Sequence, residues 1–182
     1  MNPGKPPVKS DDQTGISITA LTATDLDAAL ALQSRSYPAF LVEDAAAFAS
    51  RMGLAASFCL AARREGELLG YVLAHGWPRQ SPPTVGTVLT DCGPGEVLFI
   101  HDLAVASAGR GSGVGRMLIA RAFDLAARDG LRRAELIAVE GAADYWRRLG
   151  FVAVPVSGTL AAKVATYGPQ ACWMEREIPQ DR

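Results

Sequence analysis

A run of six residues at positions 110–115, Arg-Gly-Ser-Gly-Val-Gly, constrains this chain more than any other feature. It follows residues 97–105, which are nearly all apolar apart from His101 and Asp102, and it precedes a helical pattern that continues to Asp129. Continuous apolar character predicts a strand buried on both faces. A junction from such a strand to a helix directs several backbone N–H groups and the positive end of the helix dipole at one point. Its three glycines let the main chain approach an anion closely, so the run predicts a phosphate or pyrophosphate site.

The spacing of the glycines distinguishes between the known kinds of phosphate loop. A Walker loop requires a Gly-Lys-Ser/Thr ending, and this run contains no lysine. A dinucleotide fingerprint requires its third glycine three residues after the second, but that position is Arg116 and Gly115 comes one residue early. The remaining pattern is Arg/Gln-x-x-Gly-x-Gly/Ala, which Arg110, Gly113 and Gly115 fill.

Hydrophobic periodicity along the rest of the chain predicts an α/β class with a mixed sheet. The strand at 97–105, the helix after the glycine run and a second buried strand at 134–139 form a βαβ unit with a right-handed crossover. Strands at 58–63 and 68–75, joined by a short turn, predict an antiparallel hairpin. The other expected elements are a strand at 16–19, helices at 24–37, 43–52 and 142–149, and closing strands at 151–156 and 171–177.

Length and composition limit what the chain can be. With 182 residues, 49% of them apolar and 20% charged, we expect a flexible tail at 1–14 and a single folded domain at 15–182. A net charge of −1 gives no general attraction to nucleic acid or to a membrane. The three cysteines lack metal-ligand spacing, and we expect no metal site. No secretory signal or membrane span is evident, so we expect a cytoplasmic protein.

The glycine run resembles the acetyl-CoA pyrophosphate loop of the GNAT N-acetyltransferases. The segment from His101 to Val105 precedes it as the splayed fourth strand of that family does, and residues 142–151 look like the family's short helix that ends in aromatic-x-x-x-Gly-Phe. The resemblance covers about residues 16–178. It implies a mostly antiparallel, twisted sheet with a central parallel βαβ unit and flanking helices, acetyl-CoA as co-substrate, and a monomer or homodimer. It also implies an N-acetyltransferase acting on a primary amine of a small molecule or peptide.

The resemblance further implies where the cofactor lies. The pantetheine arm would pair with the backbone of Leu103, Ala104 and Val105, where two strands diverge. The expected cofactor-binding residues are Leu103, Ala104, Val105, Arg110, Gly111, Ser112, Gly113, Val114, Gly115, Arg116 and Trp146.

Acetyl transfer to an amine requires proton transfer, because an alkylammonium has a pKa of about 10.4 and is no nucleophile until it loses a proton. Histidine is the side chain best matched to that task near neutral pH. On a regular strand His101 shares one face with Phe99, Leu103 and Val105, close to the expected thioester, while Asp102 points to the other face. The segment is similar to that of arylalkylamine N-acetyltransferases, although their second base position falls on Phe99. His101 is therefore either the general base, directly or through water, or a structural histidine, and Asp102 is expected to be held by backbone or arginine.

The family's general acid is a tyrosine at the position that Trp146 occupies, and an indole N–H cannot deliver a proton. Tyr145 and Tyr167 are the candidate acids, and a thiolate can also leave without protonation.

The acceptor is expected between residues 36–44, the loop at 77–95 and the Tyr167 loop. The candidate acceptor residues are aromatic (Tyr37, Phe40, Trp77, Trp173) or acidic (Glu43, Asp44, Asp91), each of which has an ordinary structural role as its alternative. Two other functions stay open, namely a non-catalytic acyl-CoA-binding module and a nucleotide-dependent enzyme.

Overall fold

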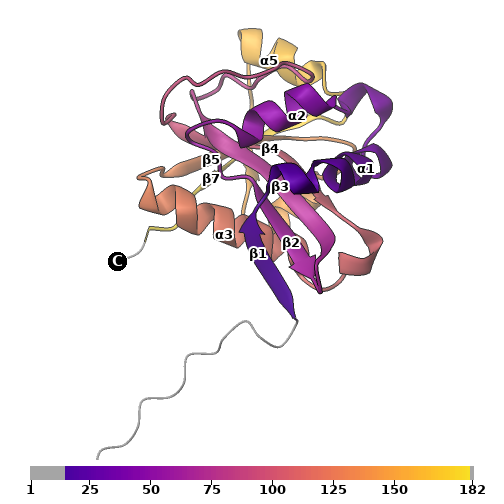
Figure 1. The fold of residues 1–182 in the computed structure, drawn as a ribbon. Coiled ribbons are helices and arrows are strands. Elements are labelled where there is room, and N and C mark those ends of the chain that lie inside the picture. The colour runs from indigo at the N-terminus through magenta and orange to yellow at the C-terminus, as the bar shows by residue number, and fades with distance from the viewer. Residues whose placement is uncertain (1–14, 181–182) are drawn as a thin grey trace, which may run out of the picture.

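The computed structural model describes residues 15–180, so the expected tail at 1–14 lies outside the described residues. Within them, seven strands form one sheet in the order β1-β2-β3-β4-β5-β7-β6 (Figure 1). Only β4 and β5 pair in parallel, which confirms the mixed, mostly antiparallel sheet with a central βαβ unit. The strands are β1 (Ile16–Ala20), β2 (Leu60–Arg64), β3 (Glu67–Trp77), β4 (Val97–Val105), β5 (Arg133–Ala138), β6 (Val152–Ala153) and β7 (Cys172–Glu177).

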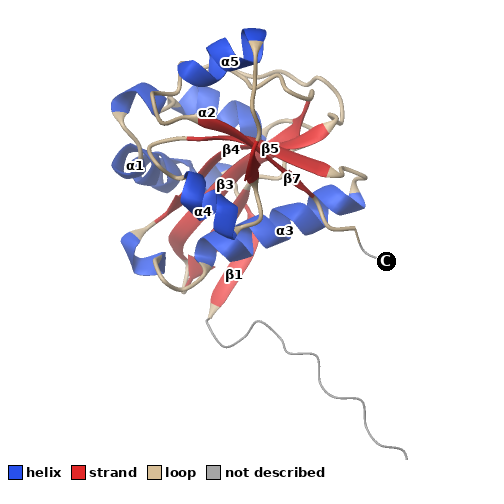
Figure 2. Cartoon of the chain, turned by 180° about the vertical axis from the view of Figure 1, so that it is seen from behind, coloured by secondary structure: helices blue, strands red, loops and turns tan. Residues whose placement is uncertain are grey.

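Helices cover both faces of this sheet (Figure 2). One face packs against α1 and α2, and the other packs against α3. The α helices are α1 (Leu26–Ser36), α2 (Ala45–Met52), α3 (Val114–Arg128), α4 (Ala143–Arg148) and α5 (Gly158–Ala165), and short 3-10 segments lie at Ala23–Asp25, Ala39–Leu41 and Ser107–Gly109. No helix among residues 15–180 is long and apolar enough to cross a membrane.

Helix α3 positions the glycine run. Its buried side chains recur at helical spacing and form one apolar stripe, which packs beneath β3 and β4. The helix begins after Gly113 and ends near Gly130, whose φ of 84° is the left-handed conformation that favours glycine. The strand–loop–helix junction predicted from the sequence is therefore present.

The C-terminal third differs from expectation. Strand β6 has two residues instead of the six predicted at 151–156, and the presumed loop before β7 contains helix α5. This helix opens with Gly158 and Thr159, which are poor helix formers, but most of residues 160–165 are good ones, so the sequence did carry a local signal for it.

Strand β4 contains a β-bulge at His101. Leu73 on β3 pairs with Asp102 and the next residue, Ala74, pairs with Ile100, so His101 is the extra residue without a partner. The bulge reverses the alternation of side chains beyond it. Leu103 and Val105 therefore pack on the α3 face, whereas His101 and Asp102 lie on the face that α1 and α2 cover. The expectation that His101 shares a face with Leu103 and Val105, opposite Asp102, is wrong for this reason.

Candidate active site

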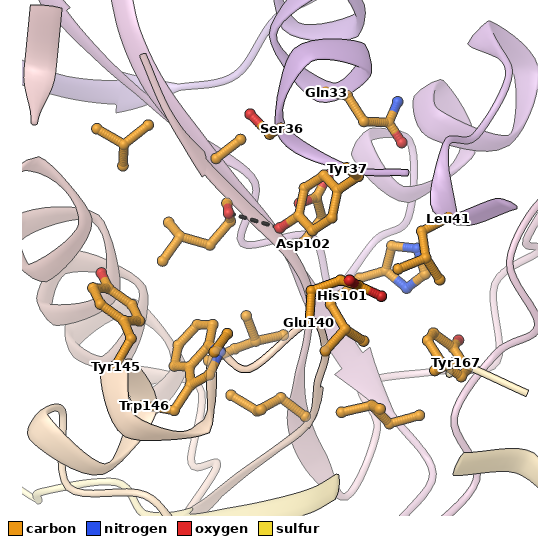
Figure 3. A pocket seen from close by; sticks show the side chains of 18 of the residues that line it. Gln33, Ser36, Tyr37, Leu41, His101, Asp102, Glu140, Tyr145, Trp146 and Tyr167 are labelled. Carbon is orange, nitrogen blue, oxygen red and sulfur yellow. Dashed lines mark hydrogen bonds between the residues drawn. The ribbon is translucent and has the colours of Figure 1, made fainter. Parts of the chain in front are cut away.

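A cavity of about 360 Å³ lies where β4 and β5 separate (Figure 3). The two strands pair only at Leu98–Ala134 and Phe99–Glu135, and beyond these positions they diverge. The cavity walls come from β4, the end of β5, the end of α1, α4 and the segment after α5. They include Tyr37, Leu41, Val85, residues 99–105, Arg110, Leu136, Ile137, Glu140, Tyr145, Trp146 and Tyr167.

The glycine run adjoins this cavity through its first residue, Arg110. Gly111 and Gly113 have φ values of 77° and 76°, and a Cβ added to either would meet nothing within 4 Å. Gly113 is the N-cap of α3, and no side chain caps the helix there. The first amide groups of α3 are consequently open to an anion. Arg110 lines the cavity, whereas Arg116 lies on a separate hollow with Arg148 and Arg176.

The three residues expected to pair with pantetheine all line the cavity. Leu103, Ala104 and Val105 lie beyond the point where β5 leaves β4, so strand β5 does not pair with them. The hydroxyl of Tyr37 donates a hydrogen bond of 2.8 Å to the carbonyl of Leu103, which joins the end of α1 to this part of β4. Cofactor pairing at these positions stays a prediction.

His101 faces the cavity and a buried carboxylate. Its Nε2 lies 3.1 Å from Oε2 of Glu43, and both side chains are nearly inaccessible. The other carboxylate oxygen, Oε1, lies 2.6 Å from Nη2 of the fully buried Arg51. Burial raises the pKa of Glu43, but the contacts with His101 and Arg51 outweigh burial and hold that pKa below its usual value. The site thus pairs an imidazole with an ionised carboxylate.

The second histidine, His75, lies deeper. Its ring centroid is 6.4 Å from that of His101 and its side chain is fully buried. Burial, aided by the proximity of His101, lowers the pKa of His75 to about 3. His75 is therefore neutral at physiological pH, and it does not line the cavity.

Asp102 is held by tyrosine rather than by the expected backbone or arginine. The hydroxyl of Tyr71 donates a hydrogen bond of 2.5 Å to its Oδ2. Burial raises the pKa of Asp102, although hydrogen bonding with Tyr37 and Tyr71 opposes that effect. Because a raised pKa favours the neutral carboxyl, Asp102 is a weaker candidate than His101 for a charged role.

Both candidate acids reach the cavity, from opposite sides (Figure 3). The hydroxyl of Tyr167 donates to the carbonyl of Pro83 at 2.8 Å, and burial raises the pKa of Tyr167 to about 12. The hydroxyl of Tyr145 lies against Gly115 in the first turn of α3, where an added Cβ would collide with it. Trp146 packs edge-on against Tyr145 and Phe151, with both centroid distances at 5.4 Å, so it mainly builds the wall.

The acceptor side is only partly as expected. Of the four aromatic residues proposed there, Tyr37 alone lines the cavity, and Trp173 is buried in a core cluster with Phe99. Asp44 caps α2 by accepting a hydrogen bond from Ala47, and Asp91 accepts one from Ala55. These two acids already have structural partners.

Sequence reasoning missed the contact of Glu43 with His101 and the place of Glu140 in the cavity wall. Glu140 has a φ of 48°, which is uncommon for a residue other than glycine. Glycine follows it in the sequence, but neither feature gives a recognisable pattern. No group of three or more potential metal ligands occurs among the residues that the structure describes.

A model of the acetyltransferase (GNAT) family matches residues 26–151. The chain therefore belongs to the GNAT acetyltransferase family. No curated protein matches the sequence at a significant level.

Solved structures share the fold at low sequence identity. Ard1 from Thermoplasma volcanium is 14% identical over 92% of this chain and 100% of its own, with a TM-score of 0.68. Naa50 from Arabidopsis thaliana, solved with the bisubstrate analogue CoA-Ac-MVNAL, is 15% identical over 89% and 97%, with a TM-score of 0.63. A GCN5-related N-acetyltransferase from Kribbella flavida is 22% identical over 90% and 98%, with a TM-score of 0.62. These likenesses confirm the expected fold, and membership of the family supports acetyl-CoA as co-substrate.

Proposed function

We propose that the protein transfers the acetyl group of acetyl-CoA to a primary amine of a small molecule or a peptide. The observation that carries this proposal is one cavity lined both by His101 and by Arg110, which begins the glycine run ahead of the uncapped N-terminus of α3. Backbone amides and Arg110 suit the pyrophosphate of CoA, and the unpaired side of β4 suits its amide-bearing arm. The peptide-containing analogue in the Arabidopsis structure supports a peptide acceptor as one of the two classes.

In this proposal His101 is the general base. Acetyl-CoA supplies an activated thioester, and the acceptor enters as an ammonium that must lose one proton before its nitrogen can attack. His101 accepts that proton directly or through one water, and the amine nitrogen then attacks the acetyl carbonyl. As the C–S bond breaks, the nitrogen releases its second proton to water and becomes the amide nitrogen. Tyr145 is our candidate to protonate the leaving sulfur, because the hydroxyl of Tyr167 already donates to Pro83.

The test is a turnover screen with acetyl-CoA and a broad panel of amines, with release of free CoA as the readout. We expect the His101→Ala variant to lose about 10²- to 10⁴-fold in kcat, which is the usual contribution of a general base. The variant should still be stabilised by acetyl-CoA in a thermal-shift assay, because the anion site is intact. If the His101→Ala variant is as active as the wild type between about pH 6 and 9, His101 is not the general base.

The same assays separate the alternatives. A non-catalytic module would be stabilised by acetyl-CoA and would acetylate no amine on the panel. A nucleotide-dependent enzyme would be stabilised by ATP or NAD and not by CoA. A cytoplasmic location stays a prediction.

A further inference from the structure

We propose that Glu43 is a positioning residue, which holds the His101 ring by its Nε2 proton and joins the base to the loop that walls the acceptor side. The inference rests on the proposed function for its catalytic meaning. Its structural content, the hold of Glu43 on one ring nitrogen, can be measured without any turnover.

The two oxygens of Glu43 have separate partners. Oε1 takes the guanidinium of Arg51 at 2.6 Å and the backbone N–H of Gly86 at 2.9 Å. Oε2 is buried, accepts no well-aligned hydrogen bond from any described residue, and lies 3.1 Å from Nε2 of His101. The imidazole of His101 is therefore the group placed to satisfy Oε2, which it does when Nε2 carries the proton.

The backbone of Glu43 is also held. Its N–H donates to Oε1 of the buried Gln33 at 2.8 Å, and its carbonyl accepts from Nε2 of Gln33 at 3.3 Å. This reciprocal pair joins the residue to α1, and the next residue, Asp44, caps α2. The backbone of Glu43 is thus held between α1 and α2, which fixes the position from which its side chain reaches His101.

An ionised carboxylate opposite Nε2 selects one form of the ring. In neutral imidazole one nitrogen carries the proton and the other carries the lone pair. A carboxylate accepts only, so Glu43 favours the tautomer protonated at Nε2 and leaves Nδ1 to take the proton of the amine. The same carboxylate stabilises the imidazolium that then forms. Neighbouring His75 and Asp102 do not compete, since burial favours the neutral form of each.

The ion pair reaches the acceptor side as well. Glu43 holds the N–H of Gly86, and Nη1 of Arg51 donates to the carbonyl of Thr87 at 3.1 Å. On the other side of this loop segment, the hydroxyl of Tyr167 donates to Pro83. Val85, which lines the cavity, lies in the sequence between these anchored residues. Loss of Glu43 should therefore change kcat through His101 and the KM of the amine through this wall, but not the KM of acetyl-CoA.

The variant must not leave a buried charge alone. Glu43→Gln by itself strands the guanidinium of Arg51, which is strongly destabilising. The test variant is therefore Glu43→Gln combined with Arg51→Met, which removes both charges at similar volume. The matched control is Glu175→Gln with Arg133→Met, since that pair also lies at 2.6 Å but joins β7 to β5 and does not line the cavity.

The readout is the ¹⁵N NMR spectrum of the imidazole nitrogens in the full chain. The protein has only two histidines, and the His101→Ala variant assigns the signals. We expect protonation at Nε2 of His101 in the wild type and in the control pair, and a mixture of tautomers in the Glu43/Arg51 variant. In turnover we expect kcat of that variant to fall about 10-fold or more, but less than in His101→Ala, with the KM of acetyl-CoA unchanged.

Three results would overturn the inference. The first is protonation at Nδ1 of His101 in the wild type, which needs only the His101→Ala variant for assignment and holds even if the double variant does not fold. The second is an unchanged tautomer in the folded double variant, and the third is a kcat equal to that of the control pair. If the wild type acetylates no amine, the proposed function is refuted instead. The NMR spectrum would still show whether Glu43 keeps the proton of His101 on Nε2.

Discussion

The replacement Gly113→Glu tests the anion site directly, because it places a carboxylate where the structure leaves the N-terminus of α3 open. Two unit charges about 4 Å apart near a protein surface repel by about 4 kcal/mol. If solvent screens half of this repulsion, about 2 kcal/mol remains, which corresponds to a roughly 30-fold weaker interaction. We expect the KM of acetyl-CoA to rise by about that factor, measured by CoA release at a saturating amine concentration.

The backbone contributes a separate effect that must be subtracted. Gly113 has a φ of 76°, and a side chain in this left-handed conformation costs about 1–2 kcal/mol. For a chain of this size, that cost lowers Tm by about 2–8 °C. The neutral variant Gly113→Gln has the same strain without the charge. Gly130→Glu, at a φ of 84° and at the opposite end of α3, has the same kind of strain far from the cavity.

These controls give the result that would refute the reasoning. All three variants should lose similar stability, but only Gly113→Glu should raise the KM of acetyl-CoA by the full factor. If Gly113→Glu loses stability but the KM of acetyl-CoA is unaltered, the phosphates of CoA do not lie at the N-terminus of α3. If Gly113→Gln raises KM equally, the effect comes from steric obstruction and charge plays no part.

Further variants test the walls of the site. Burial raises the folded-state pKa of Asp102, so its contribution to stability is lost as pH rises from the unfolded value through the folded one. In urea titrations Asp102→Asn should therefore gain stability relative to wild type as pH rises above about 4. Gly115→Ala should destabilise the wild type, because its Cβ meets the hydroxyl of Tyr145, yet it should be neutral or stabilising by up to about 1 kcal/mol in a Tyr145→Phe background. Destabilisation of the same size in both backgrounds would contradict that contact. Tyr167→Phe should lower the free energy of unfolding by about 1 kcal/mol, because the hydrogen bond to Pro83 is lost. If its kcat falls by more than the roughly 10-fold that 1.4 kcal/mol corresponds to, Tyr167 becomes a candidate acid again.

Local patterns in the sequence predicted the strand–loop–helix junction around the glycine run well. The glycine spacing, the apolar strand before it and the amphipathic helix after it all act within about 30 residues, and the structure places them as expected. The βαβ unit follows from the same short segment. Strand pairing in the N-terminal half was also predictable, because a short turn joins β2 to β3.

The surroundings of His101 were less predictable because long-range contacts determine them. The bulge at His101 depends on how β4 aligns with β3, which no pattern within β4 reveals. The contact of Glu43 with His101 joins residues far apart in the chain, and a glutamate ahead of a helix normally indicates a solvated surface. The same limit applies to Asp102, whose buried partner on β3 is a tyrosine.

The bulge also has a consequence for how this enzyme can be altered. Ile100 and Asp102 pair with adjacent residues of β3, so the hydrogen-bonded ladder would be continuous if His101 were deleted rather than replaced. The proposed base, His101, is therefore a residue that the sheet does not require for its register. A lineage could therefore acquire or discard the proton acceptor by inserting or deleting one codon, while both halves of the strand keep their neighbours. At this position the side chain proposed for proton transfer can change without a change in how β3 and β4 pair.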